Sequence, residues 1–218
     1  MRKLSGNDSG FGGDLRYGEA TGLAGADKIC TEIAESSYPG TGKKGWHAFL
    51  SAKAAGPNGA VVHARDRIGS GPWYDRTGRL VAMTLDTLLT TRPAADSAIV
   101  NDLPNERGEP NHGTPDIDNH DVVTASDAQG SYSNGVTCND WTTTETVMPD
   151  MPNSNGFNHN GPTVGHSWPA QSGQSWIRAH SAPGCSPSVS LTQTGAGSGT
   201  GIGNGGGYGG IYCFAMTP

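Results

Sequence analysis

The sequence lacks long hydrophobic runs and is poor in both hydrophobic and charged residues. No stretch of 18 apolar residues occurs among its 218 residues, so a membrane-spanning helix is not expected. Hydrophobic residues make up 33% and charged residues 16%, whereas there are 34 glycines and 14 prolines. This composition falls short of a disordered low-complexity chain. It predicts a single domain over residues 1–218, with a modest core, little helix and long irregular loops.

An excess of positive charge is also missing. The formal net charge is −6 at pH 7. Nucleic acids and anionic membranes attract basic surfaces, so neither is expected as a partner. The chain begins with the basic stretch Met1-Arg2-Lys3, but the apolar segment of a signal peptide does not follow. We therefore expect either a cytosolic protein or a mature secreted form from which the signal has been removed.

The cysteines include no CxxC pair, which argues against zinc ribbons and thioredoxin-like redox chemistry. There are four of them, and an even number at wide spacing favours disulfides and an oxidising compartment. An extracellular or cell-surface location is therefore predicted. The residues alone leave three pairings open for Cys30, Cys138, Cys185 and Cys213.

No convincing catalytic set is present, and we predict that the protein is not an enzyme. Gly201, Gly203 and Gly206 satisfy GxGxxG, but here the glycines run into a strand, whereas phosphate binding needs a following helix. Zinc-binding patterns such as HxH and HExxH are absent. Five histidines lie in loops, and three of them could converge on zinc, but surface or hydrogen-bonded histidines are the preferred interpretation of His112, His120, His159, His166 and His180.

Regular structure is predicted at a few places. Over residues 22–37 apolar side chains recur at three- and four-residue spacing, which predicts a helix with Cys30 on its buried stripe. A second short helix is predicted after Thr84, which would cap it, and before Pro93. The expected strands are 45–51, a hairpin within 72–82, then 122–125, 174–179 and 210–215.

Three segments have the composition of loop insertions: 94–121, 146–173 and 195–209. The first is polar and acidic. The second has no periodicity, and loops of that length are more often functional or disordered than merely connective. The third is glycine-rich and leads into the final strand. Trp46, Trp141 and Trp176 are predicted to be core residues, whereas Trp168 and Phe157, within 146–173, are candidates for contacting a ligand.

Four motifs carry a resemblance to a known family. They are GLAGADKIC at 22–30, GWHAFLS at 45–51, CNDWT at 138–142 and IYCF at 211–214. Their order and spacing resemble the endostatin branch of the C-type lectin-like fold, and related bacterial secreted proteins largely of unknown function. The resemblance covers about residues 1–145 and 174–215.

The resemblance implies an α+β fold, in which two helices flank a twisted, mostly antiparallel sheet that carries long irregular loops. It also implies two disulfides, Cys30–Cys213 and Cys138–Cys185. In sugar-binding C-type lectins a Glu-Pro-Asn motif ligates Ca²⁺ and binds sugar hydroxyls, and this chain has Glu109-Pro110-Asn111.

Oxygen donors follow that motif, and hard Ca²⁺ prefers oxygen ligands. The predicted Ca²⁺ set is Glu109, Asn111, Asp116, Asp118 and Asp121. The predicted ligand-binding set is Glu109, Asn111, Asp116, Asp118, Trp168 and Phe157. A solvated acidic loop is the alternative interpretation of the same residues.

The expected function is that of a secreted, non-catalytic recognition or adhesion module. Its long loops would bind a carbohydrate or an extracellular protein, with Ca²⁺ assisting. The alternative is a structural subunit of an extracellular surface layer or appendage that assembles through its loops, since low charge with abundant glycine and small polar residues suits packed assemblies as well.

Overall fold

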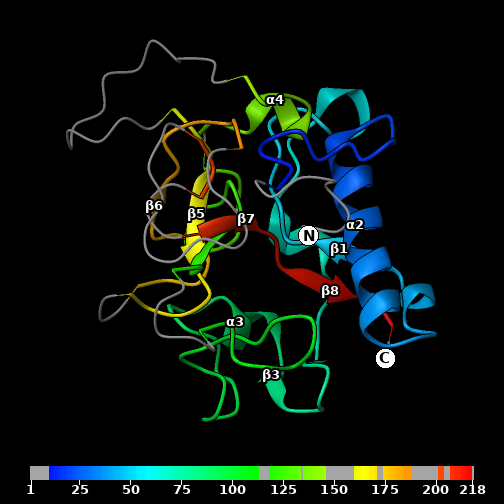
Figure 1. Ribbon diagram of the computed structural model, residues 1–218, viewed down its shortest axis with the longest axis vertical. Coiled ribbons are helices and arrows are strands. Elements are labelled where there is room, and N and C mark those ends of the chain that lie inside the picture. The colour runs from blue at the N-terminus through cyan, green and yellow to red at the C-terminus, as the bar shows by residue number, and fades with distance from the viewer. Residues whose placement is uncertain are drawn as a thin grey trace.

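The computed structural model describes residues 10–112, 118–133, 135–145, 160–170, 174–187, 201–203 and 207–217. Within these ranges the protein is a mixed α and β structure (Figure 1). The helices are α2 (Gly22–Ser37), α3 (Leu85–Leu88) and α4 (Cys138–Trp141). The strands are β1 (Trp46–Ala48), β2 (Trp73–Tyr74), β3 (Leu80–Ala82), β4 (Asp121–Val123), β5 (Thr163–His166), β6 (His180–Ser181), β7 (Gly207–Gly210) and β8 (Cys213–Ala215). Among the residues described, no helix has the length and apolar character needed to cross a bilayer.

Helix α2 has the bounds predicted from its periodicity. It begins after Thr21, whose side-chain oxygen accepts a hydrogen bond from the Ala24 N–H, and this cap satisfies one of the free donors of the first turn. The apolar stripe is buried, with Ile29 and Cys30 at 1% exposure or less. At Gly25 a Cβ would lie 2.1 Å from the Leu15 and Arg16 carbonyl oxygens, so only glycine lets the N-terminal segment pack this closely.

The strands form three small sheets. Strands β1 and β8 pair antiparallel, as do β2 and β3, and the third sheet has the order β6-β5-β4-β7, with β7 parallel to β4. In Figure 1, α2 and the β1–β8 pair lie on one side, the four-stranded sheet lies on the other, and α3 and β3 lie below both.

Both disulfides implied by the family resemblance are present. Cys30 on α2 bonds Cys213 on β8 with a Cα–Cα distance of 5.5 Å, and Cys138 bonds Cys185. The first closes a sequence separation of 183 residues, which in the chain-entropy view is worth about 5 kcal/mol. The prediction of two disulfides and of a mixed α and β class is confirmed, whereas the C-type lectin-like fold itself stays a prediction.

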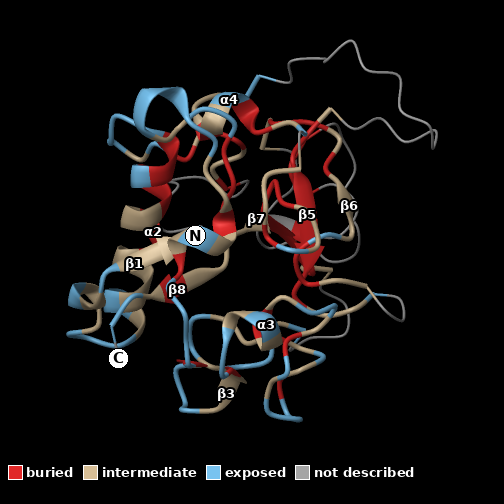
Figure 2. Ribbon diagram, turned by 180° about the vertical axis from the view of Figure 1, so that it is seen from behind, coloured by how far each residue is buried: buried red, intermediate tan, exposed pale blue. Residues whose placement is uncertain are grey.

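The core consists of two apolar clusters. The first lies under α2 and includes Trp141 together with residues of β4 and β5. The second is rich in aromatic residues, with Phe214 in ring contact with Phe49, Trp73 and Trp176. Trp141 and Trp176 are fully buried as predicted, and Trp46 is half-buried against the first cluster. Figure 2 shows β5 buried, whereas its neighbour β6 is intermediate.

Two loop and strand predictions were wrong in part. The segment 146–173 was predicted to be a loop throughout, yet Thr163–His166 forms β5 at the centre of the four-stranded sheet. All four of its residues are buried, so it lacks the polar alternation by which a short strand is recognised. Residues 174–179 form bends and irregular chain, and β6 begins only at His180.

The short hairpin and the second helix are as predicted. Strands β2 and β3 pair antiparallel across the turn at Thr77-Gly78. Thr84 caps α3 in a reciprocal capping box with Thr87. The structure also contains a short helix that was not predicted, α4, in which all four residues have positive φ angles between 51° and 65°.

Candidate metal centre

Three histidines converge on one carboxylate at an end of the four-stranded sheet. The Nε2 atoms of His166 and His180 each lie 3.1 Å from Oδ1 of Asp121, and Nε2 of His120 lies 3.4 Å from the same oxygen. One donor atom from each of these four residues falls within 4.8 Å of all the others. Among the residues that the structure describes, this group has the donors and the spacing to hold a metal ion.

The strand register brings these residues together. Asp121, the first residue of β4, pairs directly with His166, the last residue of β5, and His180 on β6 pairs with Val164. Side chains two residues apart on a strand share a face, so His166 and His180 lie on the face of the sheet that carries Asp121. His120 immediately precedes the strand and completes the group.

Two glycines allow this close assembly. A Cβ at Gly207 would lie 2.3 Å from Cβ of Asp121, so β7, the parallel neighbour of β4, must have a glycine at this position. A Cβ at Gly165 would lie 1.8 Å from the Trp176 carbonyl oxygen, so β5 must be bare where the chain before β6 crosses it. The glycine-rich segment therefore contributes to the wall of the site through Gly207.

The second nitrogen of each imidazole also faces an oxygen. Nδ1 of His120 lies 2.6 Å from Oδ1 of Asp118, Nδ1 of His166 lies 2.8 Å from Oε1 of Gln174, and Nδ1 of His180 lies 3.2 Å from its neighbour's carbonyl at Ser181. A ring whose Nδ1 carries the proton toward such an acceptor has its lone pair on Nε2. All three lone pairs are then directed toward the same small volume beside Asp121.

Three of the four residues are buried, and some of their buried polar atoms are not satisfied by hydrogen bonds. Exposure is 4% for His120, 3% for Asp121 and 1% for His166, whereas 38% of the His180 side chain is exposed. The buried atoms Oδ1 of Asp121 and Nε2 of His166 have close contacts but no aligned hydrogen bond. An unsatisfied buried polar atom costs roughly 1–3 kcal/mol, and a bound cation would remove that cost.

The protonation states of His120 and Asp121 suit a metal ion, whereas His180 would have to give up its proton to bind one. Burial lowers the pKa of His120, which keeps its imidazole neutral. Burial alone would raise the pKa of Asp121, but the contacts with His166 and His180 outweigh it and lower the pKa to about 2. For His180 the contact with Asp121 outweighs burial and raises the pKa. Neutral imidazole and ionised carboxylate are the forms that bind metal.

The donor set favours a transition metal of the zinc class. Three imidazole nitrogens and one carboxylate oxygen are typical Zn²⁺ ligands, whereas Ca²⁺ takes six to eight oxygens. Donors bound at about 2.0–2.1 Å to one tetrahedral Zn²⁺ lie ~3.3 Å apart. The three contacts to Asp121 Oδ1, at 3.1, 3.1 and 3.4 Å, match that separation.

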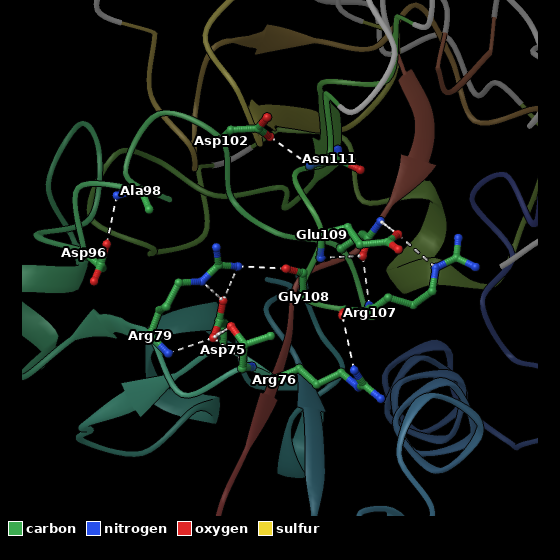
Figure 3. Close-up of polar contacts among 12 residues, drawn as sticks. Asp75, Arg76, Arg79, Asp96, Ala98, Asp102, Arg107, Gly108, Glu109 and Asn111 are labelled. Atoms are coloured by element: carbon green, nitrogen blue, oxygen red, sulfur yellow. Dashed lines mark hydrogen bonds and ion pairs between the residues drawn. The ribbon is translucent and has the colours of Figure 1, made fainter.

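The residues predicted to bind Ca²⁺ are divided between two environments. Asp121 and Asp118 belong to the histidine cluster or its edge. Glu109 lies in a separate exposed turn, where its carboxylate contacts Arg107 Nε at 3.1 Å and Asn105 Nδ2 at 3.3 Å (Figure 3). Among the described residues, Glu109 is not part of the metal-capable group.

Asn111 makes hydrogen bonds that hold neighbouring loops together. Its backbone N–H donates to Asp102 (Figure 3). Its Nδ2 donates to the Ser167 hydroxyl at 2.7 Å and to the Asn119 carbonyl at 3.1 Å. These bonds fasten the 102–112 turn to the residues that flank His120 and His166. Asp116 and Phe157, also predicted site residues, and His159 lie outside the described residues.

Trp168, predicted to contact a ligand, lies beside the cluster. Its ring packs edge-on against His120 with the ring centres 4.9 Å apart, and stacks on exposed His112 at 3.7 Å with planes 10° apart. Its Nε1 donates to Oδ1 of Asn119 at 2.8 Å. The half-buried indole therefore connects the cluster to an exposed aromatic surface.

The sequence offered only a weak signal for this site. His120, His166 and His180 were among the five histidines considered for zinc. They are far apart in the sequence and are brought together by the register of β4, β5 and β6, so no short sequence motif identifies them. Comparison with known proteins adds no relative: no protein-family model and no curated protein matches the chain. The functional argument therefore depends on the chemistry of the site.

Proposed function

We propose that the chain is an extracellular, non-catalytic recognition module that requires a bound metal ion of the zinc class. The observation that carries this proposal is the convergence of three Nε2 atoms on Oδ1 of Asp121 within 3.4 Å, where Oδ1 of Asp121 and Nε2 of His166 are buried without an aligned hydrogen bond. Four protein donors around one ion are typical of structural zinc sites, which supports a non-catalytic role.

In this proposal the ion joins the ends of three short strands of the four-stranded sheet. Strands β4, β5 and β6 contain three, four and two residues, and isolated strands of this length are marginal in water. The surface next to the ion, made by Trp168 and His112, would then be rigid enough to contact a glycan or an extracellular protein. Aromatic faces of this kind stack on sugars and anchor protein interfaces.

The experiment is thermal melting of the protein stripped of metal and then supplied with Zn²⁺ or Ca²⁺. Ligand present at 100 times its dissociation constant stabilises by about 2.7 kcal/mol, which raises the melting temperature by roughly 5–10 °C for a domain of this size. We expect that rise with Zn²⁺ and none in His166→Gln. A rise with Ca²⁺ alone would favour the oxygen-donor hypothesis instead.

The matched control is His112→Gln, because His112 lies close to the site but is exposed and outside the metal-capable group. This variant should keep the full response to Zn²⁺. A wild-type protein whose melting temperature ignores both ions, with no metal found by elemental analysis, would contradict the proposal.

Ligand recognition and self-assembly are tested separately. A glycan array probed with the Zn²⁺-loaded protein and with Trp168→Ala would reveal a sugar ligand that needs the indole. Size-exclusion chromatography over a concentration series addresses the structural-subunit alternative, which a monomer at high concentration would count against.

A further inference from the structure

Asp118 lies two residues before His120 and outside the four-residue group that could hold the metal. Its Oδ1 is 2.6 Å from Nδ1 of His120, the shortest contact that either nitrogen of this ring makes. The Asp118 side chain is 22% exposed and that of His120 is 5% exposed, so the contact is shielded from water. Both of the contacting atoms are buried, and beyond this close contact neither has an aligned hydrogen bond within the part of the chain that the structure describes.

We propose that Asp118 is a positioning residue, which holds the His120 ring with Nε2 toward the ion and thereby sets the affinity of the site. This inference depends on the proposed metal binding and identifies what regulates its strength. A carboxylate facing Nδ1 fixes the ring orientation and its proton, and it makes the opposite nitrogen a stronger donor.

His120 needs this support more than its partners do. His166 is a member of β5, paired in register with Asp121, and its Nδ1 faces the Gln174 amide. His120 precedes β4, and within the described part of the chain its two ring nitrogens face only the carboxylates of Asp118 and Asp121. Without Asp118 the ring could turn over and exchange its two nitrogens.

The oxygens behind the three rings also differ in charge. Asp118 presents a carboxylate to His120, Gln174 presents a neutral amide to His166, and a backbone carbonyl of Ser181 faces His180 at 3.2 Å. Charged acceptors form the stronger contacts. Asp118 is therefore the outer residue whose removal should weaken metal binding most.

The test is a Co²⁺ titration of the metal-stripped full chain, followed by the visible absorption of bound Co²⁺ and by competition with Zn²⁺. For Asp118→Asn we expect a loss of affinity of about 10- to 100-fold, which is the usual cost of removing an outer-shell partner. At saturation the absorption bands should keep the wild-type positions, because the four donors are unchanged. Asp118→Glu should recover part of the lost affinity.

Asp102→Asn is the matched control. Asp102 accepts backbone N–H bonds from Asn111 and His112, so its loss disturbs the same loop without touching a ring nitrogen. It should leave the Co²⁺ affinity within about twofold of wild type. Far-ultraviolet circular dichroism and a count of free thiols establish that each variant is folded with both disulfides closed.

The outcomes separate the two proposals. A wild-type chain that binds neither Co²⁺ nor Zn²⁺ overturns both. Wild-type binding with unchanged affinity in folded Asp118→Asn overturns only the role of Asp118. Bands that shift at saturation in Asp118→Asn would make Asp118 a direct ligand and overturn its role as a positioning residue.

Discussion

Two regions of this protein are held together by different physical means. Around α2, β1 and β8 the chain is fixed by an apolar stripe and by the Cys30–Cys213 bond, neither of which needs a bound ion. At the ends of β4, β5 and β6 the contacts are made by imidazoles and carboxylates, and the buried atoms Oδ1 of Asp121 and Nε2 of His166 have no aligned hydrogen bond. The difference teaches that the first region is complete in itself, whereas the proposed cation would complete the second.

The largest loss of stability is expected from removing the disulfide of the first region. Replacing Cys30 and Cys213 together by serine should lower the free energy of unfolding by up to about 5 kcal/mol, because the bond closes a separation of 183 residues. Denaturant unfolding under non-reducing conditions measures it. The pair Cys138 and Cys185, at a separation of 47, should cost about 1 kcal/mol less in the same entropy model. An unfolding curve unchanged by the first double substitution would contradict a stabilising role for the bond between α2 and β8.

In the second region the decisive change is Asp121→Asn. It removes the only charged donor of the four and should abolish the stabilisation by Zn²⁺, about 2.7 kcal/mol at 100 times the dissociation constant. Melting with and without Zn²⁺ measures this loss. If the variant still gained the wild-type increment from Zn²⁺, Asp121 would not be the centre of the site.

The glycine segment offers an intermediate test. Gly207→Ala would force a methyl group to within 2.3 Å of Cβ of Asp121, so we expect a loss of roughly 1–3 kcal/mol and weaker metal binding. Gly210→Ala, on the same strand, would make only ordinary contacts at 3.8 Å or more and should be nearly neutral. Chemical unfolding and Co²⁺ titration of the two variants should differ accordingly; equal behaviour would show that β7 yields to the added methyl.

The smallest expected effect lies outside both regions, at Asp75. The buried Asp75 carboxylate accepts hydrogen bonds from the Arg79 backbone and side chain and from Thr77, and these outweigh burial and lower its pKa below the ordinary 3.8. Its contribution is therefore present above pH ~4 and is lost as the pH falls through the lowered pKa.

Asp75→Asn should consequently destabilise at pH 7 by about 1–2 kcal/mol and much less at pH 2. Urea unfolding of both proteins at the two pH values measures the difference. The same loss of stability at pH 2 and pH 7 would mean that the ionised form of Asp75 is not what stabilises the turn.

Much of the first region could be predicted from sequence. The stripe of α2 and the Thr84 cap are local patterns, because residues close in sequence decide them. The pairing of Cys30 with Cys213 followed from the family resemblance, not from the residues alone. Trp141 and Trp176 could be assigned to the core because large aromatic side chains bury so much apolar surface.

The second region could not be predicted in the same way. Strand β5 is buried on both faces and only four residues long, so neither alternation nor length distinguishes it. His120, His166 and His180 meet through strand register, which no spacing in the chain reveals. The Glu-Pro-Asn motif drew attention to Glu109, yet its carboxylate is paired with Arg107, whereas Asp121, at the end of the predicted set, is the residue on which the histidines converge.

The C-terminal segment connects the two regions within a few residues. Gly207–Gly210 forms β7 against Asp121 and Val122, and Cys213, after two further residues, is bonded to Cys30 on α2. A force that pulled the four-stranded sheet away from α2 would be transmitted through residues 207–213 to the Cys30–Cys213 bond. The segment is thus one of the links between the two regions, beside the apolar cluster that packs α2 against residues of β4 and β5.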